Sequence, residues 1–320
     1  MANIKDIAKM AGVSVTTVSR VLNNHPYVSS EKRNAVRLAI EKYNYQRNIN
    51  AVHLSKGKTF LIGVVVPFTN HPYFGLLVEG ISDEAINHNY KLVLFQTNYE
   101  ENREEEALKM LKHKQIDALI ICSRICDWHI IDKYAAYGSI ILCEDVGERN
   151  ISSAYVDHYK SFWKALDYLH QKGHHKIGYC VGGKTGSNSR QRESAYKDFL
   201  RQWNQEFELK YIFYDCFHFE DGERIIKGLL EMNNPPSALL VASDQVAAGI
   251  LTCCKANNIK VPKELALMGF DNQPIAKVMN ITTLEIPLME LGRKLFRQAI
   301  DRSTISHEEI GVKLIERQTV

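Results

Sequence analysis

The chain has 320 residues, of which 45% are apolar, 9% aromatic and 24% charged. This is the composition of an ordinary globular protein, and it excludes a disordered, collagenous or disulfide-scaffold chain. The net charge of +3 is unevenly divided: residues 1–58 hold ten Lys or Arg against three acidic residues, a net of +7, and the remaining residues sum to −4. A small basic head on a mildly acidic body predicts a module that binds a polyanion, joined to a module of different function.

The cysteines indicate a reducing compartment. Their number, seven, is odd, and Cys122, Cys143 and Cys180 stand in apolar, strand-like runs. This usage is typical of reduced thiols rather than of a secreted disulfide framework. Residues 1–9 lack the continuous apolar segment of a signal peptide, and no apolar run approaches the roughly 20 residues that a membrane span needs. We therefore expect a cytoplasmic protein with no membrane segment.

Residues 1–46 carry helix signals only, and we expect an all-α domain there. A first helix follows Asn3, a suitable N-cap, and ends at Gly12, where glycine turns the backbone without a Cβ penalty. Ser14 is suited to cap a second helix, and Ser29 or Ser30 a third. Helical spacing gives the inner faces of the three helices as Ile4, Ile7, Ala8, Ala11, Val18, Val21, Leu22, Val36, Ala39, Ile40 and Tyr43.

Residues 4–23 have the pattern of a helix-turn-helix, in which the start of the second helix points into a DNA major groove. Val15 and Thr16 would then contact base edges, because their methyl groups suit the methyl group of thymine. Arg20 lies one turn further along and would reach a guanine or a phosphate. The short hydroxyls placed for phosphates are those of Ser14, Thr17 and Ser19. The alternative from these residues alone is a small helical domain with solvated charges.

From residue 61 onward, apolar strand-like runs alternate with amphipathic helical stretches. Strands are expected at 61–66, 92–96, 118–122, 140–143, 154–156, 177–181, 211–214, 238–242 and 265–268, and helices at 102–114, 158–171, 190–206, 244–257 and 288–302. Continuous apolar strands between helices indicate parallel sheets covered on both faces. So many strands exceed one small sheet, and we expect two halves with residues 144–153 as the passage between them.

The helix-turn-helix string closely resembles that of the lactose-repressor/galactose-repressor (LacI/GalR) family of bacterial transcription regulators. The resemblance continues along nearly the whole chain, at 28–29, 43–45, 62–64, 242–249, 269–272, 284–287 and 314–317. It implies a small all-α helix-turn-helix head (1–46), a hinge helix and linker (47–59) and an effector-binding and dimerisation body (60–320). The body would be α/β, with two doubly wound parallel-sheet subdomains as in periplasmic binding proteins. One would span about 60–150 plus 286–302, and the other about 151–285 plus 303–320.

The resemblance also assigns DNA contacts. Residues from about 48 to 55 match the family's hinge helix, and Leu54 stands at the place of the leucine that wedges into the minor groove. An apolar side chain between base steps unstacks them and bends the duplex. The chain departs from the family at Arg47, where a proline is usual. The complete set of expected DNA-binding residues is Ser14, Val15, Thr16, Thr17, Ser19, Arg20, Asn23, Tyr45, Asn48, Ala51 and Leu54.

Small molecules bind doubly wound halves at the carboxyl ends of the strands, in the cleft between the halves. Aromatic rings there stack on sugars or purines, and Arg and Asp side chains hydrogen-bond hydroxyl groups. Loop position and family resemblance together assign effector binding to Asn70, Tyr73, Phe74, Asp145, Arg192, Phe217, Asp244 and Asp271. The alternatives are a core role for Tyr73 or Phe74 and a helix-capping role for Asp244.

Residues 178–185 satisfy the pattern GxxxxGK[ST] of a phosphate-binding loop, which leaves a P-loop nucleotide hydrolase as an enzyme alternative. The context argues against it, because Gly178 would lie inside a strand and residues 186–189 prevent an immediate helix. The pairs at 174–175 and 253–254 are adjacent His and Cys residues whose side chains point apart, so no metal site is expected. We expect neither a cofactor nor an enzyme activity.

The sequence therefore predicts a homodimeric or larger homo-oligomeric transcription regulator, a repressor of sugar-utilisation genes, bound to a roughly palindromic operator. A small-molecule effector, a sugar or sugar derivative, would control operator affinity from the cleft. Helices 73–89 and 244–257 are candidates for the dimer surface. A regulator driven by a protein corepressor stays open as the alternative, and purines would fit the aromatic residues of the cleft equally well.

Overall fold

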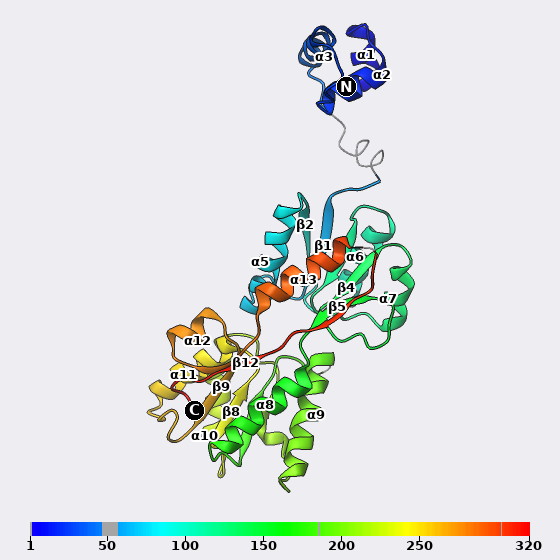
Figure 1. Cartoon of the computed structure of the whole chain (residues 1–320). Helices are drawn as coiled ribbons and strands as arrows, with labels where there is room; N and C mark the ends of the chain where they lie inside the picture. The colour runs from blue at the N-terminus through cyan, green and yellow to red at the C-terminus, as the bar shows by residue number, and fades with distance from the viewer. Residues whose placement is uncertain (1, 47–56, 185, 302) are drawn as a thin grey trace. The chain divides into compact units, whose positions relative to one another are not determined.

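The computed structural model describes residues 2–46, 57–184, 186–301 and 303–320. It divides into two compact units, Met1–Thr59 and Phe60–Val320, which are coloured from blue to red along the chain in Figure 1. We call the first the head and the second the body, and describe each by itself.

The head is built from three helices, α1 (Ile4–Met10), α2 (Val15–Leu22) and α3 (Ser30–Lys42). The Asn3 side chain accepts hydrogen bonds from the backbone of Lys5 and Asp6, and the Asp6 carboxylate accepts one from the backbone of Asn3. This capping box starts the first helix where its donors would otherwise be unpaired. Gly12 makes the predicted turn with a φ of +64°. The three helices bury Ile7, Ala8, Val18, Val21, Val36 and Ala39 against one another.

The expectation that Tyr43 faces this core is wrong. Its side chain is 48% exposed, because α3 ends at Lys42 and the helical spacing does not extend beyond it. Asn44 then adopts a φ of +45° and turns the chain. The turn brings Tyr45 back against the core, where it is partly buried.

The first sheet of the body has six strands in the order β11-β5-β4-β3-β1-β2, all parallel. The strands are β1 (Leu61–Val66), β2 (Lys91–Gln96), β3 (Ala118–Ile121), β4 (Ser139–Leu142), β5 (Ser152–Tyr155) and β11 (His307–Glu309). Helices α5 (Pro72–Asn87) and α13 (Leu288–Ile300) pack on one face, and α6 (Glu101–Lys112) and α7 (Trp128–Ala135) on the other. Figure 1 shows α5 and α13 side by side on their face.

The second sheet also has six strands, in the order β12-β10-β9-β8-β6-β7. They are β6 (Ile177–Cys180), β7 (Ile212–Phe213), β8 (Ala238–Val241), β9 (Ala266–Asp271), β10 (Thr282–Glu285) and β12 (Lys313–Ile315), and the last pairs antiparallel with β10. The helices are α8 (His158–Gln171) and α9 (Ser187–Gln202) on one face and α10 (Asp221–Leu230) and α11 (Asp244–Ala256) on the other, with η1 (Leu209–Tyr211) and α12 (Pro274–Val278) beside them.

The two sheets share one strand order, since β2-β1-β3-β4-β5 in the first corresponds to β7-β6-β8-β9-β10 in the second. This is a doubly wound order, so the expected fold class of the body is confirmed. The expected subdomain limits need correction at two places. Strand β5 pairs with β4, and β11 pairs with β5, so that both belong to the first sheet. The chain therefore passes to the second subdomain after residue 155, and not within 144–153.

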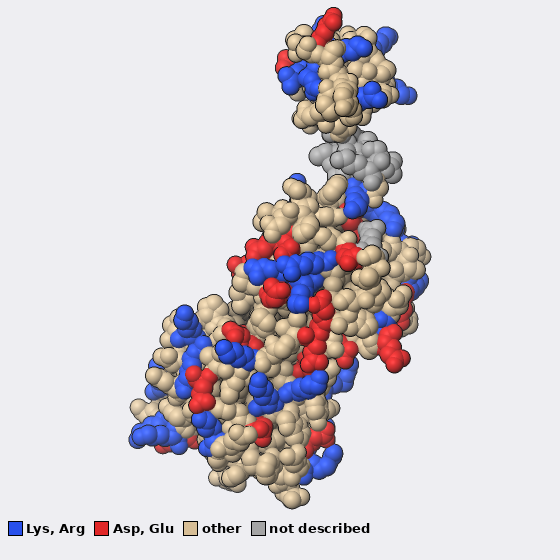
Figure 2. Space-filling view, viewed as in Figure 1, with Lys and Arg blue, Asp and Glu red and all other residues tan. Residues whose placement is uncertain are grey.

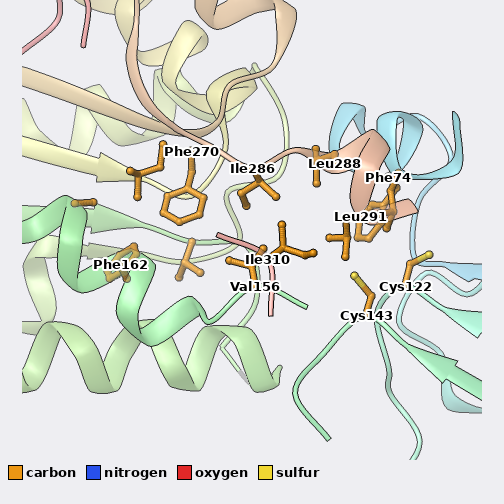
Figure 3. Packing of buried hydrophobic residues seen from close by; sticks show 14 of the residues in the cluster. Phe74, Cys122, Cys143, Val156, Phe162, Phe270, Ile286, Leu288, Leu291 and Ile310 are labelled. Carbon is orange, nitrogen blue, oxygen red and sulfur yellow. The ribbon is translucent and has the colours of Figure 1, made fainter. Parts of the chain in front are cut away.

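Three segments connect the subdomains, and each buries an apolar side chain where it crosses. Val156 follows β5, Ile286 follows β10 and Ile310 follows β11, and all three are at most 8% exposed. Figure 3 shows them between Phe162 and Phe270 of the second subdomain and the cluster around Leu291 of the first. One continuous apolar core thus runs through the crossing point. No helix in the described part of the chain is long and apolar enough to cross a membrane.

Candidate functional site

The first turn of α2 presents small side chains on the surface of the head. Val15 is 40% exposed, and Thr16 and Arg20 are also exposed. The Ser14 hydroxyl accepts a hydrogen bond of 3.1 Å from the Thr17 backbone N–H and lies 2.9 Å from the Thr17 hydroxyl. Ser14 is therefore the N-cap of α2, a role that fixes the first turn and with it the direction of the neighbouring side chains.

Of the other predicted DNA-binding residues, some lie in the described part of the head and the rest lie outside the described residues. Asn23 lies at the C-cap of α2, where its amide nitrogen donates to the Ser19 carbonyl oxygen over 2.9 Å, and Tyr45 packs against the core of the head. Asn48, Ala51 and Leu54 lie outside the described residues. Figure 2 shows Lys and Arg side chains spread over the visible face of the head with few acidic ones, as the net charge of residues 1–58 requires.

The body contains a cavity of about 600 Å³ at the carboxyl ends of strands from both sheets. Five of the predicted effector residues line it, namely Tyr73, Phe74, Arg192, Phe217 and Asp271. Tyr73 and Phe74 come from the first turn of α5, after β1, whereas Arg192 comes from α9 and Asp271 ends β9. The cavity therefore joins residues as far apart in the chain as Tyr73 and Asp271, as the strand-end rule predicts. We call this cavity the cleft.

Asn70, Asp145 and Asp244 are not among the residues that line the cleft. Asn70 and Asp145 are exposed, and the Asp145 carboxylate accepts a hydrogen bond from the backbone of Gly147 within its own turn. These two positions follow strands β1 and β4, but their loops turn the side chains toward solvent. A strand-end position alone does not fix the direction of a side chain.

Asp244 is fully buried and faces the interior of the second subdomain. Its carboxylate accepts hydrogen bonds of 2.7 Å from the backbone N–H of Gln273 and 2.7 Å from the hydroxyl of Thr283. The N-cap of α11 is Ser243, so Asp244 is not the cap either. It instead joins the start of α11 to the segments around β9 and β10. Burial raises its pKa from 3.8 to about 7, against the opposing effect of these hydrogen bonds.

Arg192 and Asp271 both present a buried polar atom to the cleft. Arg192 donates from Nη2 to Nδ1 of His158 over 3.2 Å, and Oδ2 of Asp271 accepts from the Gln273 amide over 2.9 Å. Within the described residues, Nε of Arg192 and Oδ1 of Asp271 have no hydrogen-bond partner. A buried polar atom without a partner is costly, and a ligand that supplies the missing donor and acceptor removes that cost.

Burial controls the ionisation of this group. It raises the pKa of Asp271 well above its usual value, with a further contribution from Asp244, and Arg192 opposes the effect. It lowers the pKa of His158 well below its usual value, so the imidazole is neutral and accepts from Arg192. Arg192, Asp271 and His158 therefore offer the cleft a buried cation, a carboxyl group and a neutral acceptor, a set suited to hydroxyl groups.

Three aromatic side chains, Phe68, Tyr99 and Phe217, form one wall of the cleft. The Phe68 ring of the first subdomain lies 5.7 Å from the Phe217 ring of the second and 5.5 Å from the Tyr99 ring, both edge to face. Tyr99 and Phe217 are 6.3 Å apart. Edge-to-face pairs at these separations are favourable, so the wall holds the two subdomains together on this side.

The sequence reasoning missed Phe68, Tyr99 and His158 among the lining residues, and it missed the pair formed by Arg124 and Glu144. Arg124 donates from Nε to Oε1 of Glu144 over 2.6 Å, and both side chains are about 10% exposed. Phe68, Tyr99, Arg124 and Glu144 each stand within a few residues of a predicted strand end, and that position was the available signal. The partners within each contact lie far apart in sequence, so no local pattern links them.

The phosphate-binding-loop alternative is not favoured by the structure. Gly178 lies inside β6, and helix α9 begins at Ser187 rather than at the lysine of the motif, Lys184. The Lys184 ammonium lies 4.7 Å from the centre of the Tyr214 ring. The described residues contain no group of three or more His, Cys, Asp or Glu side chains placed to hold a metal ion.

Comparison with known proteins identifies relatives over the whole chain. Residues 3–48 match the family model of bacterial regulatory proteins, lacI family, and residues 59–319 match that of periplasmic binding proteins and sugar binding domain of LacI family. The uncharacterized HTH-type transcriptional regulator YkvZ of Bacillus subtilis is 42% identical over 324 residues, with 100% of both chains covered. The NTD biosynthesis operon regulator NtdR of the same organism is 38% identical over 304 residues, covering 94% of this chain and 92% of NtdR.

A solved structure with a similar fold is that of a LacI family transcriptional regulator from Lactobacillus casei with bound glucose. It has a TM-score of 0.75 and 26% sequence identity, and the match covers 81% of this chain and 99% of that one.

Proposed function

Because the chain belongs to the LacI family of bacterial regulatory proteins, we propose that it represses sugar-utilisation genes and that a small carbohydrate in the cleft controls its affinity for operator DNA. Regulators of this family bind DNA and are not enzymes. The observation that carries the proposal is the pair of unpartnered buried atoms in the cleft, Nε of Arg192 and Oδ1 of Asp271.

The DNA-binding half of the proposal rests on α2. Val15 and Thr16 are exposed at its first turn, which the Ser14 cap holds rigid, and Arg20 is exposed one turn further along. Small side chains followed by an arginine suit base edges first and a guanine or phosphate next. The net charge of +7 over residues 1–58 supplies attraction to the phosphate backbone.

The sensing half rests on the size and chemistry of the cleft. A volume of about 600 Å³ suits one small ligand, and the aromatic wall offers ring faces beside a cation and a carboxyl group. An adjacent donor and acceptor match neighbouring hydroxyl groups of a sugar. A cavity of this size between the two subdomains favours a small molecule over a protein corepressor as the effector.

We further propose a cytoplasmic homodimer on a roughly palindromic operator. Two-fold symmetry of the protein is then matched by the two half-sites of the DNA. The effector would bind one arrangement of the two subdomains more tightly than the other, and this difference would change the affinity for DNA. Helix α5 belongs to the first subdomain, so a dimer surface that includes α5 would lie on that subdomain.

The test is a crossed pair of variants in the full chain. An operator duplex is first selected from a random DNA pool by the wild-type protein, and sugars, sugar phosphates and nucleobases are screened by thermal shift, with D-glucose included. Arg20→Ala is expected to weaken operator binding about 5- to 150-fold, the loss of one base contact, and to leave the ligand shift unchanged. Asp271→Ala is expected to abolish the ligand shift and leave DNA affinity in the absence of ligand unchanged.

Two matched controls remove charges of the same kind elsewhere. Arg37→Ala removes an exposed arginine of α3, and Asp145→Ala removes an exposed carboxylate outside the cleft. Both should behave as wild type apart from a small uniform loss of DNA affinity for Arg37→Ala. If Arg20→Ala and Asp271→Ala both changed DNA affinity alone, the division into a reading head and a sensing body would be wrong.

A further inference from the structure

Two cysteines meet behind the aromatic wall of the cleft. Cys180 ends strand β6, and Cys216 stands in the turn between β7 and α10, directly before the wall residue Phe217. The backbone N–H of Cys216 donates to the carbonyl oxygen of Val181 over 3.1 Å, which brings Cys216 beside the end of β6, and both cysteines belong to one buried cluster. The Cys216 thiol itself lies 3.4 Å from the carbonyl oxygens of Phe213 and Tyr214. Both residues are buried, at 1% and 5% exposure, and Cys216 is among the residues that line the cleft. A ligand in the cleft therefore lies next to one member of a thiol pair.

The guanidinium of Arg224 lies against the sulfur of Cys216. Its Nη2 atom is 3.6 Å from Sγ and donates over 3.0 Å to the carbonyl oxygens of both Tyr214 and Asp215. The two carbonyls hold the cation in place beside the sulfur. The carboxylate of Asp221, 3.5 Å from the same nitrogen, reduces its effect without replacing the contact to sulfur.

The arginine contact distinguishes the two thiols as an attacking thiol and a resolving thiol, because Arg224 lies against the sulfur of Cys216. The neighbouring Cys180 thiol and the charge of Arg224 lower the pKa of Cys216, whereas burial raises the pKa of Cys180. All seven cysteines are described, and Cys216 is the one whose pKa is lowered. A thiolate is the reactive form of cysteine, and a neighbouring arginine is a usual cause of its formation.

We propose that Cys216 and Cys180 form an oxidisable dithiol, in which a hydroperoxide converts Cys216 to a sulfenic acid and Cys180 then closes a disulfide. In the first step the Cys216 thiolate attacks the terminal peroxide oxygen, the O–O bond breaks, and the leaving alkoxide or hydroxide takes a proton. In the second step the sulfur of Cys180 attacks that of Cys216, and the displaced hydroxide leaves as water with the Cys180 proton. The two thiols lose two electrons, which the peroxide accepts.

Closing the disulfide changes the cleft because Phe217 follows Cys216 in the chain. An S–S bond is about 2.05 Å long, shorter than any non-bonded contact between two sulfurs, so closing it draws the turn before α10 and the end of β6 together. The Phe217 ring has little room to absorb the shift, since a Cβ at Gly182 would lie only 2.5 Å from it. The ring contacts of Phe217 with Phe68 and Tyr99 must therefore change. The consequence for gene control rests on the proposed function, whereas the thiol chemistry does not.

The test uses the full chain, reduced, freed of reductant and treated briefly with hydrogen peroxide. Peptide mass mapping is expected to show a linked pair of peptides containing Cys180 and Cys216, with a mass lower by two hydrogen atoms, which dithiothreitol reverses. Cys180→Ser should stop at a Cys216 sulfenic acid that dimedone traps, and Cys216→Ser should give no linkage. Cys253→Ser, the matched control at a partly exposed cysteine, should behave as wild type. Arg224→Gln should slow the oxidation of Cys216.

Two results would overturn the proposal. One is oxidation of Cys253 ahead of Cys216, and the other is a Cys216 sulfenic acid in the wild type that never becomes a disulfide. The effect on the wall is measured by hydrogen exchange without any ligand, and oxidation is expected to speed exchange in residues 66–75 and 214–219. Unchanged exchange in both segments would refute the coupling to the cleft. DNA binding of the reduced protein is measured separately, so that its absence would refute the proposed function and leave the dithiol result standing.

Discussion

Replacing Asp244 with asparagine is expected to stabilise the body near neutral pH and not at acidic pH. The carboxylate is fully buried, and it accepts hydrogen bonds of 2.7 Å from the backbone of Gln273 and from the hydroxyl of Thr283. An asparagine keeps both contacts, because its amide oxygen accepts from the Gln273 N–H and its amide nitrogen donates to the Thr283 hydroxyl oxygen. The substitution therefore removes a titratable proton and little else.

The size of the effect follows from the pKa of Asp244, which burial raises from 3.8 in the unfolded chain to about 7. Between these values the folded protein holds a proton that the unfolded chain has released. The stabilisation is therefore complete below about pH 4 and is lost as the pH rises through 7. The whole difference corresponds to about 4 kcal/mol, of which about 3 kcal/mol is lost between pH 5 and pH 8. The free energy of unfolding of Asp244→Asn should exceed that of wild type by this increasing amount.

Urea unfolding at pH 5, 6, 7 and 8 measures the difference. Trp128, Trp163 and Trp203 are the chain's three tryptophans and all belong to the body, so their fluorescence follows the body without the head. Asp145→Asn, at an exposed position, is the control and should follow wild type at every pH. A gap between Asp244→Asn and wild type that stays constant from pH 5 to pH 8 would show that Asp244 does not carry the titration.

Three further predictions concern the cap of α2, the ion pair at the cleft and the charge of the head. Ser14→Ala removes the hydrogen bond to the Thr17 backbone and should destabilise the head by about 1 kcal/mol, seen as a lower first transition in a far-UV melt. Arg124→Met leaves the buried Glu144 carboxylate unpaired and should cost about 3–5 kcal/mol in urea unfolding; adding Glu144→Gln should recover most of that loss. Operator affinity measured between 50 and 200 mM KCl should fall steeply, with a log–log slope of about −0.9 per phosphate neutralised, and a flat response would contradict phosphate contacts by the head.

The strands of the body were predictable where they are apolar throughout. The runs at 61–66, 118–121 and 238–241 are buried on both faces, which leaves a continuous apolar signal. Strand β10 was missed because its two threonines are polar yet fully buried. Thr282 and Thr283 are satisfied by Arg317, Thr319 and Asp244, and partners 35 or more residues away leave no local pattern.

The cleft was predictable in position and only partly in composition. The strand-end rule placed Arg192 and Asp271 correctly in the cleft, because the carboxyl ends of parallel strands meet at one edge. The same rule failed to give the directions of Asp145 and Asp244, since these depend on a loop turn at Asp145 and on the buried hydrogen bonds of Asp244 with Gln273 and Thr283. Asp271 itself adopts a φ of +99°, a conformation that no sequence pattern announces.

The crossing segments described above also bear on the order in which the protein folds during synthesis. The head is a contiguous stretch of chain with its own core, so it can fold as soon as it leaves the ribosome. The first subdomain cannot, because α13 and β11 come from residues 288–309, after all of the second subdomain except β12 has been made. Until then α5 has no helix beside it and β5 is an open edge. The apolar face under α13 therefore stays uncovered on the nascent chain until residues 288–300 have been made.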